Sequence, residues 1–385
     1  MKRATTTRML ALDVFRGVTI AGMLLVNLPG SWSAIYTPVA HSEWHGCTPA
    51  DLIFPFFLFI VGITTHLSFL ARRSRGDTDR TIVRQALRRG IIIVLLGLAF
   101  SAFPYYPLTR ITAMRIPGVL QRIGVTYIFG ALLTLRTTVK QQVAIIVAIL
   151  FGYWFAMTLI PVPETHVLGA LTLDTPPATL AAWVDRLLFN GHLWINSVTW
   201  DPEGPFSTIP AIATVMLGAL AGQWLVPATD DQSHSFEARL NALFAVGALG
   251  IMAGLMWNWS FPINKSLWTS SYVVYTAGVA CVTLATCSWI VDVQRIRWWT
   301  HPFVIFGTNP IVVFVGSEVM ARTIYSLIKF DVHGRRMSLQ SYLYETLFAS
   351  WLPPKDASLL FAACIMLVWL GILTILYRRK IFLKV

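Results

Sequence analysis

Long apolar runs recur along this chain, and they restrict its fold more than any other feature. Each run has about the length that an α-helix needs to cross a lipid bilayer. Inside a bilayer every backbone N–H and C=O group must be paired within the protein, so only helices and closed barrels can span it. We therefore expect an all-α, polytopic membrane helix bundle with about ten transmembrane helices. The runs lie at residues 9–28, 50–71, 89–104, 117–135, 141–160, 206–226, 239–258, 268–291, 302–328 and 357–377.

The composition agrees with a membrane protein. Hydrophobic residues make up 56% of the 385 residues and charged residues only 12%, whereas soluble domains carry about 25% charged residues. The net charge of +12 does not require a nucleic-acid partner, because Lys and Arg collect in cytoplasmic loops of membrane proteins. The basic start MKRATTTRML has no small-residue cleavage site after the first apolar run, so we expect a retained first span rather than a signal peptide.

The distribution of basic residues predicts the orientation. An even number of spans places both termini on one side, and that side carries the richest Lys and Arg segments, 72–89 and 378–384. The positive-inside rule makes this side cytoplasmic. On the outside we expect a short interfacial helix within 338–352. No internal repeat of the kind found in many transporters is evident, so residues 1–385 are expected to form a single transmembrane domain.

The outer segment HSEWHGCTPAD places His41, His45 and Asp51 at the start of the second span. A histidine can exchange a proton near neutral pH, and a neighbouring carboxylate can fix its tautomer. Asp51 is equally suited to be a simple charge at a helix start. Gly46 and Pro49 argue against a helix that would align the two histidines for a metal, so no metal site is expected.

Two further outer segments lead directly into spans. Asp201 and Glu203 lie between prolines, where they either shape a rigid turn or bind a cationic or polyhydroxyl substrate. Asn264 and Lys265 precede the eighth span, and the lysine is either an interface anchor or a site residue.

Several polar residues lie within or at the ends of the spans. Arg16, with Asp13 one turn before it, is either half of a structural ion pair or a functional charge. Convergent polar groups from several helices indicate a catalytic or binding vestibule on the outer face. The residues expected at this vestibule are Asn27, His41, Asp51, Asp201, Glu203, Asn264 and Lys265; the other polar residues in spans are Gln121, Arg122 and Asn309.

Five segments together resemble the heparan-alpha-glucosaminide N-acetyltransferase family, within the transmembrane acyltransferases. The resemblance covers nearly the whole chain in the family's order, and it is to the bacterial NagX-like branch, which lacks the additional lumenal domain of the lysosomal enzyme. The segments are LDVFRGVTIAGMLLVN, HSEWHGCTPADLIFPFFLFIVG, RIPGVLQRIGVTY, DPEGPFSTIPAI and FPINKSLWTSSYV.

The resemblance implies transfer of an acetyl group from cytoplasmic acetyl-CoA, as co-substrate, to the amine of glucosamine or of a glucosamine-terminated saccharide. It assigns catalysis to His41 and places a family asparagine at Asn27. As a mechanism we expect His41 as general base, Asn27 as oxyanion donor and Asp51 as the group that orients His41. His45 is a second choice, because the lysosomal enzyme has asparagine there. Substrate contacts are expected from Trp44, Asp201, Glu203, Asn264 and Lys265, and acetyl-CoA contacts from Arg16, Gln121, Arg122 and Asn309.

Several alternatives stay open. His41 can act as a base in a ternary complex, or it can itself be acetylated first. An amino-sugar permease and an O-acyltransferase acting on an envelope glycan are competing functions. We expect an integral protein of a bacterial inner membrane with its active site near the periplasmic face. The small-residue face GALGIMAG is suited to helix packing within one chain or in a homodimer.

Overall fold

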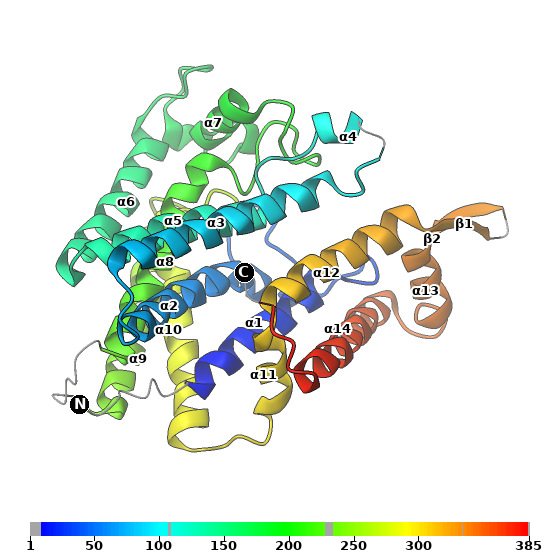
Figure 1. The fold of residues 1–385 in the computed structure, drawn as a ribbon. Coiled ribbons are helices and arrows are strands. Elements are labelled where there is room, and N and C mark those ends of the chain that lie inside the picture. Colours follow the sequence, from blue (N-terminus) through cyan, green and yellow to red (C-terminus); the bar gives the residue numbers. More distant parts are fainter. Residues whose placement is uncertain (1–8, 107–108, 228–233, 333, 384–385) are drawn as a thin grey trace.

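The computed structural model describes residues 9–106, 109–227, 234–332 and 334–383. Helices dominate it (Figure 1), which confirms the all-α class, and each expected apolar run coincides with one or two of them. Residues 1–8 and 384–385, part of the basic ends used to infer the orientation, lie outside the described residues. The main helices are α1 (Leu10–Asn27), α2 (Ile53–Arg73), α3 (Asp79–Ala102), α5 (Val119–Arg136), α6 (Val139–Leu159), α8 (Pro205–Leu225), α9 (Phe236–Trp257), α10 (Ser270–Ser288), α11 (Thr300–Thr308), α12 (Pro310–Arg322) and α14 (Pro354–Arg378).

Eight helical segments of the described chain are long and apolar enough to cross a membrane. The protein is therefore an integral membrane protein. Helices α3 and α5 are not among the eight. Helix α3 begins with a strongly basic stretch, and α5 carries Gln121 and Arg122 in its first turn.

The ninth expected run is broken into two helices. Helix α11 ends before Asn309, and Pro310 begins α12, because proline has no N–H to continue the helical hydrogen-bond ladder. The Asn309 side chain lies at this break and fixes the segment that follows α14. Its Nδ2 donates to the carbonyl oxygen of Ile381 at 3.1 Å, and its Oδ1 accepts from the N–H of Leu383 at 2.9 Å.

Short elements connect the main helices. The strands β1 and β2 form an antiparallel hairpin in which Lys329 pairs with Ser338, and the sequence analysis did not anticipate it. The helix expected within 338–352 is confirmed as α13. These elements are η1 (Thr37–Val39), η2 (Pro49–Leu52), α4 (Thr109–Thr112), η3 (Gly169–Thr172), η4 (Pro176–Ala178), α7 (Leu180–Phe189), η5 (Trp289–Val293), η6 (Thr323–Leu327), β1 (Lys329–Val332), β2 (Arg335–Ser338) and α13 (Leu339–Leu347).

Helices α2 and α8 touch backbone to backbone at two glycines. A Cβ atom on Gly62 would lie 2.0 Å from the carbonyl oxygen of Val215, and one on Gly218 would lie 2.0 Å from that of Phe59. The contact fixes the start of α2 relative to the start of α8, and both starts carry candidate site residues.

The small-residue face of α9 packs against another helix of the same chain. A Cβ on Gly278 of α10 would lie 2.7 Å from the carbonyl oxygen of Gly247 and 2.9 Å from the carbonyl carbon of Gly250. The GALGIMAG segment therefore packs α9 against α10, and this contact does not bear on the expected homodimer.

The longer connections meet at one end of the bundle, which we call the loop face. It consists of residues 28–52, 103–106, 109–118, 160–204, 258–269 and 328–332 with 334–353. Hydrogen bonds tie these connections to one another. The N–H of Gly46 donates to the carbonyl of Ile263 at 2.8 Å, and the N–H of Ile116 donates to that of His192 at 2.9 Å. Residues distant in sequence are thereby brought together on this face.

We expect Gly218→Ala to lower the free energy of unfolding by about 2 kcal/mol, because the added methyl group must push α2 and α8 apart. Gly152→Ala in α6 is the matched control, since a Cβ there meets no atom within 4 Å. Thermal unfolding in detergent measures both variants. An equal melting temperature for Gly218→Ala and Gly152→Ala would contradict this account of the α2–α8 contact.

Candidate active site

The carboxylate of Asp51 is buried at the start of α2 and uses its two oxygens differently. Its Oδ2 accepts from the N–H groups of Ser42 and Thr48, each at 3.0 Å, and from the Thr48 hydroxyl at 3.1 Å. This oxygen closes the capping box of η2. Its Oδ1 lies 2.8 Å from Nδ1 of His41. The side chain therefore serves both as a helix-start carboxylate and as a partner of the histidine.

His41 lies on the loop face with 39% of its side chain exposed. When its Nδ1 carries the proton and donates to Asp51, Nε2 keeps a lone pair and can accept a proton from a substrate. This arrangement of a partly exposed imidazole backed by a buried carboxylate is the orienting half of many acid–base sites. The sequence analysis predicted this pair, and the structure brings the two side chains together.

Lys265 completes a three-residue cluster. Its Nζ lies 3.0 Å from Nδ1 and 3.4 Å from Nε2 of His41, and 3.4 Å from Oδ1 of Asp51. Burial lowers the pKa of Lys265 below its ordinary value, against the opposing effect of the Asp51 and Glu203 charges. Lys265 and Asp51 compete for Nδ1, because a protonated Nδ1 donates to the carboxylate and an unprotonated one accepts from the lysine. Which of these two groups bonds to Nδ1 therefore determines which ring nitrogen of His41 carries the proton.

Asn264 is fully buried beside Lys265 and shapes the turn that carries it. Its side-chain Oδ1 accepts from the backbone N–H of Leu267 at 2.8 Å, and its backbone N–H donates to the Thr269 hydroxyl at 3.0 Å. Its Nδ2 lies 3.3 Å from Nδ1 of His45. Asn264 therefore fixes the turn that places Lys265 beside His41 and Asp51.

His45 forms a second pair, with a residue that the sequence analysis missed. Its Nε2 lies 2.9 Å from Oδ1 of Asp174, whose side chain is 89% exposed. Because Asp174 lies 129 positions further along the chain, no local pattern reveals the pairing. The neighbouring Trp44 is held by a hydrogen bond from its Nε1 to the carbonyl of Leu173 at 2.8 Å.

Asp201 and Glu203 already have a protein cation as partner. Arg115 donates from Nε to Oδ2 of Asp201 at 2.8 Å and from Nη2 to Oδ1 of Asp201 at 2.5 Å. Nη2 also donates to Glu203. Burial lowers the pKa of Arg115, but the two carboxylate charges outweigh it and raise that pKa overall. Arg115 lies in the segment RIPGVLQRIGVTY and was not singled out, although it is the cation that pairs with both carboxylates of this loop.

Asp185 is a further buried carboxylate in this region that the sequence analysis missed. Its Oδ2 accepts from the N–H of Asp201 at 2.9 Å, whereas its Oδ1 has no hydrogen-bond partner among the described residues. Burial raises the pKa of Asp185 to about 7. A lone acidic residue in the apolar stretch LAAWVDRLLF is the signal that could have identified it.

The four residues expected to contact acetyl-CoA fall into two groups. Arg122 is fully buried at the loop-face end of α5, where it donates to the Thr208 hydroxyl at 3.2 Å and stacks over the Trp268 ring at 5.0 Å. Gln121, beside it, donates to the Ser101 hydroxyl at 3.3 Å. Arg16, which donates to the carbonyl of Gly307 at 3.0 Å, and Asn309 lie instead along α1 and at the α11–α12 break.

Asn27, the last residue of α1, is half-buried, and its side chain makes no hydrogen bond to another described residue. The η2 turn that carries Asp51 packs against α1. The structure therefore leaves the Asn27 amide available near this end of the bundle and gives it no contact with His41.

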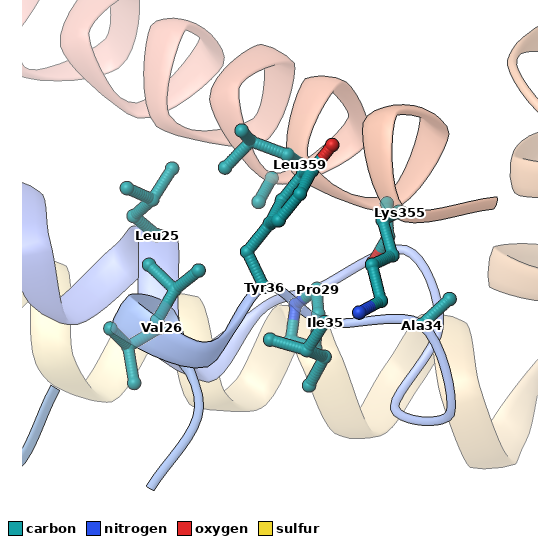
Figure 2. Close-up of a pocket in the computed structure, with 11 residues that line it drawn as sticks. Leu25, Val26, Pro29, Ala34, Ile35, Tyr36, Lys355 and Leu359 are labelled. Atoms are coloured by element: carbon teal, nitrogen blue, oxygen red, sulfur yellow. The ribbon is translucent and has the colours of Figure 1, made fainter. Parts of the chain in front are cut away.

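A small hollow with a cavity volume of about 10 Å³ lies between the end of α1, the following loop and α14. Figure 2 shows the Tyr36 ring crossing it toward α14, where its hydroxyl donates to Asp356 at 2.5 Å. The residues that line this hollow are mainly aliphatic and include neither His41 nor Asp51, so the hollow is separate from the candidate site. The lining residues are Leu25, Val26, Pro29, Ala34, Ile35, Tyr36, Val39, Lys355, Ser358, Leu359 and Ala362.

The raised pKa of Asp185 predicts a pH-dependent stability. Since the folded pKa of about 7 exceeds the unfolded value of about 3.9, the native state holds a proton that the unfolded chain has released, and stability falls as pH rises between these values. We expect Asp185→Asn to gain roughly 2–4 kcal/mol relative to wild type between pH 5 and pH 8. Melting temperatures at both pH values measure this gain; the same difference at pH 5 and pH 8 would contradict it.

Comparison with known proteins identifies the family. The family model described as heparan-alpha-glucosaminide N-acetyltransferase, catalytic, matches residues 8–262. The heparan-alpha-glucosaminide N-acetyltransferases of Mus musculus and Homo sapiens are each 30% identical to this chain, over 430 and 427 residues, and the alignments cover 100% and 99% of it. The chain spans about three-fifths of these relatives, 61% and 60% of their length. The family resemblance is confirmed, and the NagX-like branch stays a prediction. The chain belongs to the heparan-alpha-glucosaminide N-acetyltransferase family.

Proposed function

We propose that this protein is a transmembrane N-acetyltransferase. It moves the acetyl group of cytoplasmic acetyl-CoA to the amine of glucosamine, or of a glucosamine-terminated saccharide, at the loop face. The observation that carries the proposal is the His41–Asp51 pair, with its 2.8 Å separation, on the exposed end of a membrane helix bundle. Residues 1–385 act as one acyltransferase domain, in a bacterial inner membrane with the loop face toward the periplasm.

The chemistry follows from the tautomer of His41. With Nδ1–H donating to Asp51, Nε2 accepts a proton from the amine as the amine nitrogen attacks the thioester carbonyl carbon. The new C–N bond forms, the C–S bond of the tetrahedral intermediate breaks, and the imidazolium returns its proton to the leaving thiolate. The Asp51 carboxylate stabilises the imidazolium between these two steps, as a buried anion beside a transient cation.

Other groups support this reaction. Asn27 is proposed as the donor to the oxyanion that forms on the acetyl carbonyl, a role worth about 2.7–4 kcal/mol in comparable sites. Trp44 and Lys265 border the acceptor position, and the buried Asn264 holds the turn that carries Lys265. Since Arg115 already pairs with both Asp201 and Glu203, we propose that these carboxylates hold the shape of the loop and contact sugar hydroxyls only through their remaining lone pairs.

Acetyl-CoA is proposed to enter from the end opposite the loop face. Exposed arginines from 73 to 89 cluster there, and their charge suits the phosphates of the nucleotide. The pantetheine arm then runs between helices toward His41. Arg16 and Asn309 lie nearer to the entry, and Gln121 and Arg122 nearer to the acetyl group, which agrees with their two separate positions.

An acetylated cysteine is disfavoured as an intermediate. Cys47 lies close to Asp51, but burial, reinforced by the Asp51 charge, raises the pKa of its thiol to about 12. The thiolate is the nucleophilic form of cysteine, and at this pKa it is almost absent at neutral pH. If a covalent acetyl-enzyme forms, His41 is the residue that carries it.

We expect His41→Ala to lower the rate of acetyl transfer about 10²–10⁴-fold, because the proton acceptor is lost. The assay supplies acetyl-CoA with and without glucosamine to purified protein in detergent, and follows both free thiol and N-acetylglucosamine. His301→Ala, an exposed histidine at the start of α11, is the matched control and should keep wild-type activity.

Each outcome of this assay has a distinct meaning. Thiol release that requires the acceptor supports direct transfer with His41 as base. Thiol release without acceptor indicates an acetylated enzyme or hydrolysis instead. Neither thiol nor product from wild type would overturn the enzyme proposal in favour of an amino-sugar permease. Turnover with hydroxyl acceptors alone would favour an O-acyltransferase.

We expect Asp51→Asn to fold normally and to lose activity about 10²-fold or more. The asparagine oxygen can still accept from Ser42 and Thr48, whereas its NH₂ group would face Nδ1 of His41 and select the wrong tautomer. Melting temperature and kcat, measured on the same preparation, separate the two effects. A loss of stability in proportion to the loss of activity would argue for a purely structural Asp51.

A further inference from the structure

An amine of the protein itself lies where the proposed reaction needs the amine of the acceptor. Nζ of Lys265 is 3.4 Å from Nε2 of His41, the ring nitrogen that takes the proton in the proposed reaction, and 3.0 Å from Nδ1. The Lys265 side chain is 23% exposed, so a bound thioester can reach it. A nucleophile held this close to a base is positioned to compete with the substrate for the acetyl group.

Lys265 differs in its surroundings from the other lysines that the structure describes. It is half-buried, and its amine contacts the side chains of His41 and Asp51. A protonated lysine has no lone pair to attack with, whereas a lysine that is shielded from water releases its proton more readily and becomes nucleophilic. The remaining described lysines are all exposed: Lys140, Lys329, Lys355 and Lys380.

The charges around Lys265 do not hold it firmly as an ammonium ion. Burial lowers its pKa, and this effect exceeds the opposing effect of the Asp51 and Glu203 charges. Oδ1 of Asp51 lies 3.4 Å from Nζ, which is longer than a charge-assisted hydrogen bond. Glu203 already pairs with Arg115. The titratable groups that face Lys265 are His41, Cys47, Asp51 and Glu203.

Acetylation of this amine needs acetyl-CoA as its only co-reactant. The lone pair of neutral Nζ attacks the thioester carbonyl carbon, and Nε2 of His41 accepts a proton from Nζ. The N–C bond forms, the C–S bond breaks, and the imidazolium returns the proton to the leaving thiolate. The products are acetylated Lys265 and CoA with a free thiol.

We propose that Lys265 is a site of self-acetylation, which is modified when acetyl-CoA is bound and the amino sugar is absent. This inference rests on the proposed function and deepens it, because it adds a regulatory modification to the same site. The product is an amide, so it is a dead end and not an intermediate of the sugar reaction. Acetylation removes the charge of Lys265 and fills part of the acceptor position, and the modified protein is therefore inactive.

The acceptor protects Lys265, because both amines need the same place beside His41. A bound amino sugar takes the acetyl group and leaves as product, whereas in its absence Lys265 is the nucleophile beside the base. Cys47 does not compete, since burial raises the pKa of its thiol to about 12 and keeps it protonated. The acetylated fraction of the protein therefore rises with the ratio of acetyl-CoA to acceptor.

The test incubates purified protein with acetyl-CoA, with and without glucosamine, and follows acetylation of each lysine by peptide mass spectrometry. We expect Lys265 to be acetylated at least about tenfold faster than Lys329, because Lys265 lies beside the base. Lys329, an exposed lysine of β1 on the loop face, is the matched control, and glucosamine should slow only Lys265. Equal rates for the two lysines would overturn the proposal, because the acetylation would then be adventitious.

Activity towards glucosamine, measured after excess acetyl-CoA has been removed, should fall in step with acetylation of Lys265. In Lys265→Arg the activity, taken as a fraction of the variant's own starting value, should no longer fall, because the amine is gone. A fall of the same size in Lys265→Arg would overturn the link between this modification and inactivation.

Labelling of the wild type with acetic anhydride tests the amine itself, because this reagent needs no cofactor site. We expect Lys265 to reach its full labelling rate at a lower pH than Lys329, since burial lowers the pKa of Lys265. The same pH dependence for both lysines would overturn the proposal.

Failure of this inference and failure of the proposed function give different results. If wild type makes no N-acetylglucosamine but acetyl-CoA still acetylates Lys265 faster than Lys329, the modification site stands while the proposed reaction fails. If wild type acetylates glucosamine but Lys265 stays unmodified after prolonged incubation with acetyl-CoA alone, the reaction stands and the inference is overturned.

Discussion

The buried carboxylate of Asp51 is the constraint on which the loop face depends. A charge that leaves water must be paired and fully hydrogen-bonded, or it destabilises the fold by several kcal/mol. Here the backbone N–H groups of Ser42 and Thr48 satisfy one oxygen, and His41 with Lys265 satisfies the other. These hydrogen bonds hold the 41–48 segment against the start of α2, and they place the turn before α10 beside it. The same bonds that stabilise the fold also orient the imidazole for proton transfer.

The site has two layers of charge with different tasks. The outer layer consists of His41, whose partly exposed imidazole can exchange protons, and of the more buried Lys265. The inner layer consists of Arg115, Asp201 and Glu203, in which one guanidinium pairs with two carboxylates and links the segments that lead into α5 and α8. A sequence that shows two carboxylates at a helix start suggests a binding site for cations, and here the cation comes from the protein itself. The Arg115 guanidinium also lies 5.9 Å from the centre of the Trp194 ring.

The sequence predicts the local features of this protein well and the long-range pairings poorly. Every expected apolar run is helical, because the backbone must pair its polar groups within the helix in a bilayer, but only eight helical segments of the described chain are long and apolar enough to cross a membrane. His41 and Asp51 were predictable as partners because ten positions separate them, whereas Arg115 and Asp201 are separated by 86. Asp174 was missed because a single exposed carboxylate has no local pattern, whereas Asp185 was missed although it is the lone acidic residue in an apolar stretch. The β1–β2 hairpin is too short and polar to produce a periodic signal.

The central claim is that the acetyl group crosses the membrane and meets the amine at the loop face. A sided assay in sealed proteoliposomes tests it most directly, with acetyl-CoA added outside and glucosamine enclosed inside. Either orientation of the protein exposes only one face to each compartment. The account predicts that N-acetylglucosamine accumulates inside, and that little forms when both substrates are outside. Efficient turnover with both substrates on the same side, and none across the bilayer, would contradict it.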